Sequence, residues 1–173
     1  IYFQGEACAA GGVCAPTVAS RSPAVGETGV LATAEIAVTF AEPVDPESIL
    51  SSISGLPTGI FAVHQGTAAG PVLSGAFRFE NSGAANTLNT FPVCADPGTA
   101  TLENPRAFDR LVFTPNAPLA SGTHTVVLTD ATDVVCPNPT ATPLATNPVH
   151  VAVTDSAGNC LSNTADYTFT VEN

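Results

Sequence analysis

The stretch from Val149 to Val171 contains two short runs in which apolar and polar residues alternate, at positions 149–153 and 167–171. Successive side chains of a β-strand point to opposite faces, so each run can bury one face and expose the other. Between them lies Asp155–Asn159 (DSAGN), in which Gly158 permits a positive φ. We therefore expect a hairpin that closes a half-buried antiparallel sheet.

The same alternation recurs along the chain, most regularly in Ala34–Phe40 (AEIAVTF). Further strands are expected at 17–29, where only a short edge strand fits, and at 60–63, 77–79, 111–115 and 124–128. Arg78 and Glu80 are expected on a solvent-exposed face. No amphipathic helix of useful length occurs. About seven short strands separated by turn residues predict an all-β fold, an antiparallel β-sandwich, with a closed barrel as the alternative.

Prolines interrupt this pattern after the strand that ends at Phe40. Pro43 and Pro46 cannot donate to a ladder, so we expect the chain to break at Glu42–Pro46. Pro46 can instead open a helical turn that Asp45 caps and that runs to Ile53.

Two segments, at about 81–109 and 131–148, lack sustained periodicity and are too long for ordinary connections. We interpret them as insertions in a single domain at 17–173, preceded by a leader loop at 6–16. Residues 1–5 (IYFQG) are identified as the remnant of a protease site from an expression tag. Ile1–Phe3 are expected to pair with an edge strand of this molecule or of a neighbour.

The charge balance excludes several partners. Four Lys and Arg residues stand against 15 Asp and Glu, which gives a net charge of −11, and there is no Lys. Such a field repels nucleic acid and anionic lipid. No apolar run approaches the ~20 residues of a membrane span, so any lipid anchor is expected outside these residues.

The five cysteines lie in turn-like surroundings: Cys8, Cys14, Cys94, Cys136 and Cys160. None belongs to a Cys-x-x-Cys pair, which disfavours zinc. Because the composition is acidic and rich in Pro and Thr, as in an exported domain, we expect disulfides. The odd number leaves one thiol free or paired outside this chain, and a metal-binding or catalytic cysteine is the alternative.

Four motifs occur in a characteristic order. They are Ser22-Pro23, the segment 36–46 (IAVTFAEPVDP), the segment 113–123 (FTPNAPLASGT), and the DSAGN turn followed by Phe169. This order resembles the bacterial immunoglobulin-like (Ig-like) domains of the S-layer (SbsA-like) type, over Thr17–Glu172 apart from the two irregular segments. The resemblance implies an Ig-like antiparallel sandwich. After the Leu-Ala-x-Gly-Thr corner that family usually has Tyr, and this chain has His124, which we expect to fill the tyrosine's place. His64 and His150 lie in unrelated segments, which disfavours metal ligation by histidines.

Ig strand order further implies that both insertions and most cysteines gather at one end of the sandwich. We therefore predict a Cys94–Cys136 bridge and a Cys160–Cys14 bridge, with Cys8 as the odd cysteine. Cys8 in place of Cys14, or a local Cys8–Cys14 loop, remains an alternative. Each bridge is expected to stabilise the fold by about 2–4 kcal/mol.

The same end is expected to gather five oxygen-bearing side chains: Asp45, Asp130, Asp133, Asp155 and Asn159. Calcium takes six to eight oxygen ligands, so these residues are candidates for a calcium site. The alternative is that Asp155 and Asn159 cap their own turn and the others are solvated.

No nucleophile elbow, paired-histidine zinc motif or phosphate-binding glycine loop occurs, so we do not expect an enzyme. The favoured function is a structural spacer or adhesion module of an exported bacterial protein, at the cell surface, in the periplasm or outside the cell, lipid-anchored or secreted, that contacts neighbouring domains or a surface partner. The alternative is a glycan-binding module that uses the inserted loops. Sugar sites favour exposed Trp or Tyr. The chain has no Trp, and Tyr167 is its only Tyr outside the tag remnant, which favours the structural function.

Overall fold

The computed structural model describes residues 16–50, 57–80, 108–130, 152–155, 160–162 and 166–172. The elements are β1 (Val18–Ser22), β2 (Ile36–Val44), the 3-10 turn η2 (Pro46–Ser48), β3 (Phe61–Gln65), β4 (Gly75–Glu80), β5 (Phe108–Pro115), β6 (Gly122–Leu128) and β7 (Tyr167–Val171). Within these ranges no helix is long and apolar enough to cross a membrane.

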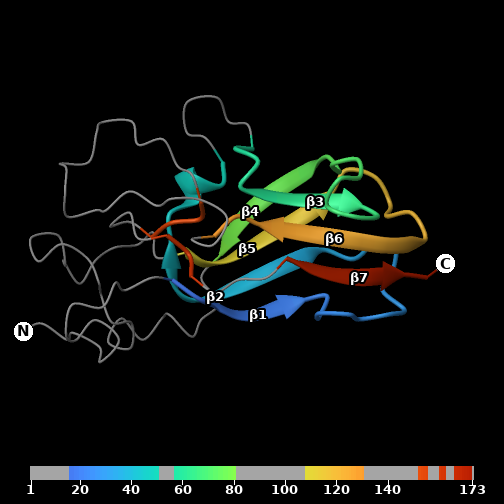
Figure 1. Cartoon of the computed structure of the whole chain (residues 1–173), viewed down its shortest axis with the longest axis horizontal. Helices are drawn as coiled ribbons and strands as arrows, with labels where there is room; N and C mark the ends of the chain where they lie inside the picture. Colours follow the sequence, from blue (N-terminus) through green and yellow to red (C-terminus); the bar gives the residue numbers. More distant parts are fainter. Residues whose placement is uncertain are drawn as a thin grey trace, which may run out of the picture.

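The seven strands form two antiparallel sheets that pack face to face (Figure 1). One sheet has the order β1-β2-β5-β4 and the other has the order β3-β6-β7. This is the strand distribution of a seven-stranded Ig-like sandwich, four strands against three. The predicted fold class is confirmed.

Alternation along the strands builds the core. In β5, Leu111 and Phe113 are at most 2% exposed, and in β6, Val126 and Leu128 are fully buried. Phe61 of β3 meets Phe77 of β4 edge to face across the two sheets, with ring centroids 5.8 Å apart. Burial of each such side chain stabilises the fold by roughly 1.5–3 kcal/mol.

Two predictions about the chain after Phe40 need correction. The predicted break at Glu42–Pro43 is wrong, because β2 continues to Val44. The pairing between β2 and β5 shifts register between Thr39 and Val44, so Pro43 lies at an irregularity and the ladder does not need its missing N–H. The helical turn does begin at Pro46, but it ends at Ser48 and not at Ile53.

The predicted hairpin between 149–153 and 167–171 is also wrong. β7 pairs with β6 on one side, with Phe169 opposite His124. On its other side, β7 bonds to the segment Gly26–Val30, so neither edge remains for a third partner. Thr154 instead lies opposite Cys160 in an isolated antiparallel bridge, and residues 156–159 of the DSAGN segment lie outside the described residues. Val149 and Val151 lie outside the described residues.

The sandwich has two distinct ends. At the loop end, β2 finishes beside the start of β5, with Val44 opposite Phe108, and β4 finishes with Glu80 opposite Arg110. At the opposite end, which we call the exit end because the chain leaves the sandwich there, β7 finishes with Val171 opposite Gly122. β5 begins at Phe108, two residues inside the range predicted as the first insertion; the rest of that insertion and all of the second one lie outside the described residues.

Candidate functional site

Backbone and side-chain hydrogen bonds join the chain just after β2 to Thr154. Asp45 caps η2, its Oδ1 accepting from the amide of Glu47 at 3.0 Å. The Asp45 amide donates to the Thr154 carbonyl at 2.7 Å. The Ser48 hydroxyl donates to the Asp45 carbonyl and accepts from the Thr154 amide at 3.3 Å. Asp45 and Asp155 are two of the candidate calcium ligands. These hydrogen bonds involve Asp45 itself and Thr154, which precedes Asp155, so both candidates lie at the loop end.

Cys160 lies beside the start of the described chain. Its side chain is 5% exposed and is not a free thiol. Two residues on, the Ser162 amide donates to the Pro16 carbonyl at 2.9 Å, and Pro16 follows Cys14 by two positions in the sequence. Cys8, Cys14, Cys94 and Cys136 lie outside the described residues, so the predicted pairings stay predictions.

The carboxylates of the loop end do not form a metal centre within the described ranges. Asp130 is fully buried, and Asp45, Asp130 and Asp155 each have polar partners. No group of three His, Cys, Asp or Glu side chains among the described residues is arranged to hold a metal ion. Asp133 and Asn159 lie outside these residues, so the calcium site stays a prediction.

His124 is the third residue of β6, just after the predicted Leu-Ala-x-Gly-Thr corner. Its imidazole is fully buried and stacks on Phe169, with ring centroids 5.3 Å apart and an interplanar angle of 11°. Nδ1 donates to the Gly122 carbonyl at 3.1 Å, and Nε2 has no hydrogen-bond partner. His64 lies on the outer face of β3, where Nδ1 bonds to the Gly70 carbonyl at 2.8 Å. These two histidines therefore do not converge, and His150 lies outside the described residues.

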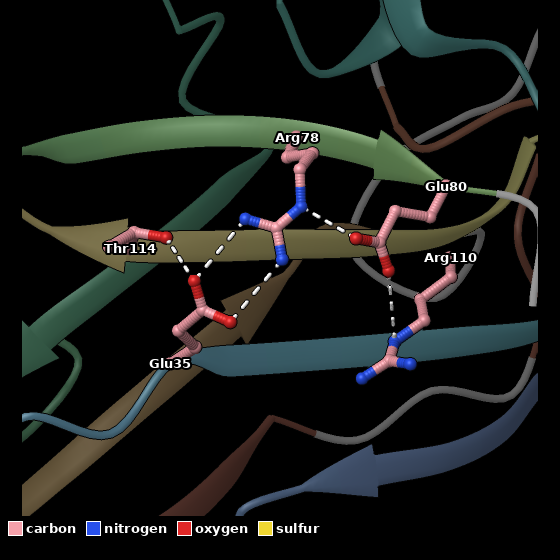
Figure 2. Close-up of polar contacts among 5 residues, drawn as sticks. All are labelled: Glu35, Arg78, Glu80, Arg110 and Thr114. Atoms are coloured by element: carbon pink, nitrogen blue, oxygen red, sulfur yellow. Dashed lines mark hydrogen bonds and ion pairs between the residues drawn. The ribbon is translucent and has the colours of Figure 1, made fainter.

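A polar network crosses the outer face of the larger sheet (Figure 2). Glu35 lies just before β2 and accepts from both terminal nitrogens of Arg78 on β4 at 3.3 Å, spanning β5 between them. The Thr114 hydroxyl of β5 donates to Glu35 at 2.7 Å. Glu80 accepts from Arg78 Nε at 2.6 Å and forms a longer ion pair with Arg110, at 3.8 Å.

Electrostatics of this network follow from those contacts. The hydrogen bond from Arg78, with help from Thr114, lowers the pKa of the Glu35 carboxyl, and the two carboxylates raise the pKa of the Arg78 guanidinium. Two arginines face two glutamates, so the network has no excess charge with which to attract an anion. Because Arg78 and Glu35 are about half exposed, water screens their attraction.

The network also covers apolar residues on the outer face. Val112 and Ala37 share a row with Arg78 across the sheet, and they are 1% and 5% exposed. The aliphatic part of an arginine side chain can cover such residues while its guanidinium stays in water. Sequence alternation placed Arg78 and Glu80 on this face, but it missed Glu35 and Thr114, because only the strand order brings them to Arg78.

A third arginine, Arg21, lies between the edge strands β1 and β7, outside this network. The guanidinium carbon of Arg21 lies 5.3 Å from the centroid of the Tyr167 ring. Tyr167 is 3% exposed and its hydroxyl has no hydrogen-bond partner. Burial raises the pKa of Tyr167, and the nearby charge of Arg21 lowers it in part. The contact between Arg21 and Tyr167 packs β1 against β7 and offers no reactive group.

Strand order and packing thus define an Ig-like sandwich. Its described polar side chains cap a turn, bond neighbouring loops and form ion pairs across a sheet. The family model of the bacterial Ig-like domain matches residues 13–148, most of the chain. The chain belongs to this family. β7 lies beyond the matched range, and the fold includes it as the third strand of the smaller sheet. A search of curated proteins gave no match.

Solved structures add distant likenesses. The N-terminal part of the bacterial S-layer protein SbsC is 16% identical over 91% of this chain, with a TM-score of 0.45, and this chain spans 24% of its length. PcoC, a methionine-rich copper resistance protein from Escherichia coli, is 16% identical over 92% of this chain and 100% of its own, with a TM-score of 0.47. This chain contains no Met. The family match confirms the Ig-like assignment, and the S-layer protein found among these solved structures is SbsC.

Proposed function

We propose that the chain is a non-catalytic Ig-like module of a bacterial cell-surface or secreted protein, and that it acts as a structural spacer between neighbouring domains. The observation that carries this proposal is the position of the first and last described residues, Pro16 and Glu172, at opposite ends of the sandwich. Pro16 lies at the loop end, bonded to Ser162, and Glu172 lies at the exit end, bonded to Val30 (Figure 1). Domains joined to these ends are held apart by the length of the strands.

The backbone bonds of the outermost strands fit a load along this axis. β1 is held by β2, and β7 is held by β6 and by the segment Gly26–Val30. Between that segment and β7, four amide-to-carbonyl bonds follow one another: Gly26 to Thr168, Thr170 to Glu27, Val30 to Thr170 and Glu172 to Val30, at 2.7 to 3.1 Å. These bonds lie across the line that joins the ends, so a pull on the ends loads them together.

We also propose an oxidising location, with bridges between Cys94 and Cys136 and between Cys160 and Cys14. Support comes from the buried Cys160 and from the hydrogen bond between Ser162 and Pro16, which follows Cys14 by two positions in the sequence. Non-reducing peptide mapping tests both pairings. A Cys8–Cys14 peptide would contradict the second one.

A glycan array separates the spacer from the alternative, a glycan-binding module. The oxidised chain is screened against immobilised glycans, and the proposal expects no saturable binding. Saturable binding that is lost when residues 81–107 are replaced by a short Gly-Ser connection would assign the function to the inserted loop instead. The melting temperature of that variant serves as the folding control.

A further inference from the structure

Arg21 points into the sandwich from an edge strand. It lies opposite Val38 of β2, which is fully buried, whereas its neighbours Ser20 and Ser22 are exposed. The strands β1 and β7 run along the same side of the molecule (Figure 1), and the Arg21 guanidinium stands over the Tyr167 ring between them. A charge that points inward needs a compensating partner.

Arg21 differs from the other two arginines that the structure describes. Arg78 forms ion pairs with Glu35 and Glu80, and Arg110 forms one with Glu80. No carboxylate of the described residues pairs with Arg21, which contacts an aromatic ring instead. This side of the sandwich therefore has one uncompensated positive charge, in a chain whose net charge is −11.

Two enclosed polar groups lack an acceptor here. Arg21 Nε is buried without a hydrogen-bond partner, and so is the hydroxyl of Tyr167, a residue that is only 3% exposed. Buried polar groups of folded proteins are nearly always hydrogen-bonded. A guanidinium can only donate, so the missing group must supply acceptor atoms. Burial raises the pKa of Tyr167, so at neutral pH its hydroxyl keeps the proton and can donate as well.

We propose that Arg21 and Tyr167 form a binding site for a carboxylate group at the seam between β1 and β7. A carboxylate has two acceptor oxygens and one negative charge, so it can accept from both donors and neutralise Arg21. Arg21 is only half-buried, so its terminal nitrogens offer the ligand an approach from solvent. The site goes beyond the spacer function and does not depend on it.

Other acceptors fit this pair of donors less well. A water molecule would satisfy the hydrogen bonds but would leave the charge of Arg21 uncompensated. A phosphate or sulfate dianion is repelled by the net charge of −11 more strongly than a monoanion is. The carboxylate itself can belong to a free small acid or to an acidic side chain of another polypeptide, since both present the same group.

Tyrosine absorption reports on this site directly, because the chain has no Trp and its only other Tyr is Tyr2 in the tag remnant. The ultraviolet difference spectrum of the full chain carrying Tyr2→Phe is followed while sodium acetate replaces sodium chloride at constant ionic strength and neutral pH. We expect a saturable shift of the Tyr167 band, because its hydroxyl gains an acceptor. Arg21→Gln should weaken acetate binding by about tenfold or more. Arg78→Gln, which alters an arginine of the outer face, should leave it unchanged.

Two further variants separate binding from folding. Arg21→Lys keeps the positive charge and lacks the planar set of donors, so its acetate affinity should fall between those of the wild type and Arg21→Gln. Tyr167→Phe removes the second donor, and titration calorimetry should show that it also binds acetate more weakly. Circular dichroism and melting temperatures check that each variant is folded.

Two blocked tripeptides, Gly-Glu-Gly and Gly-Gln-Gly, identify the source of the carboxylate. Saturable binding of the first peptide and not of the second, tighter than that of acetate, would support the site and assign it to an acidic side chain. Binding of acetate alone would support the site and assign it to a free small acid.

Three results would overturn the carboxylate site. The first is no spectral change, which would mean that the Tyr167 hydroxyl has only water or packed side chains around it. The second is a change that grows with acetate concentration without saturation. The third is an equal change in folded Arg21→Gln, which would identify a solvent effect. The spacer function would stand in all three cases, because it rests on the backbone bonds of the outermost strands.

Discussion

His124 contributes to stability mainly through packing, because its ring is enclosed and stacked on Phe169 while its single hydrogen bond reaches the backbone two residues away. We expect His124→Ala to lower the free energy of unfolding by about 2–4 kcal/mol, since it leaves a cavity in the core. His124→Phe keeps the stacking and removes the unpartnered Nε2, so it should lose clearly less. Denaturant unfolding measures both changes.

The neighbouring Thr123→Ala is the control for this pair of variants. Thr123 points outward from the same strand and is exposed, so its replacement should change the free energy of unfolding by no more than about 0.5 kcal/mol. If His124→Phe were as damaging as His124→Ala, the hydrogen bond to Gly122 would be the main contribution and the packing account would fail.

Because Tyr167 is buried, we expect the protein to lose stability in alkali. Burial raises its pKa in the folded protein above the unfolded value, so the folded state retains the phenol proton at a pH where the unfolded chain has released it. The free energy of unfolding is therefore unaffected below about pH 10 and falls as the pH rises above that value. Melting temperatures between pH 8 and pH 11 measure the effect.

Tyr167→Phe provides the comparison. The variant should lack this part of the alkaline decline, and it should be nearly as stable as the wild type at pH 7, because the hydroxyl that it loses has no partner. Parallel alkaline curves for the two proteins would contradict the burial account.

Single residues were predictable where strand alternation decides their environment. Leu111 and Phe113 point inward, and Arg78 and Glu80 point outward, as the period of two requires. The contact of Glu35 with Arg78 was not predictable, because it joins residues 43 positions apart across an intervening strand. Only the order of strands in the sheet reveals it.

At the level of elements, Gly75 at the start of β4 is required for close packing. A Cβ at this position would overlap the Phe113 ring and the Thr114 carbonyl oxygen of the neighbouring strand. Gly75→Ala is expected to lower the free energy of unfolding by about 1–3 kcal/mol through overpacking. Ala76→Ser, on the exposed face of the same strand, should be close to neutral in the same denaturant titration. A stable Gly75→Ala would mean that β4 can move away from β5 without cost.

Element positions followed from the sequence more closely than element partners did. The run at 167–171 is a strand as expected, but it joins β6, because Tyr167 and Phe169 align there with Val126 and His124. The local turn at DSAGN suggested a nearer partner. A turn restricts only its own neighbours, whereas core packing selects the register between distant strands.

For the whole molecule, the order of four short motifs was sufficient to predict an Ig-like sandwich, which the strand order and the family match confirm.

Single-molecule stretching tests the spacer function most directly. Handles at Thr17 and Glu172 pull along the strands and load the bonds of β1 and β7 together, whereas handles at Ser121 and Glu172 separate β6 from β7 one bond at a time. All of these attachment sites are exposed, so the handles should leave the fold intact, and equilibrium melting of each labelled protein checks this. We expect a clearly higher unfolding force in the first direction, and equal forces in the two directions would contradict the spacer function.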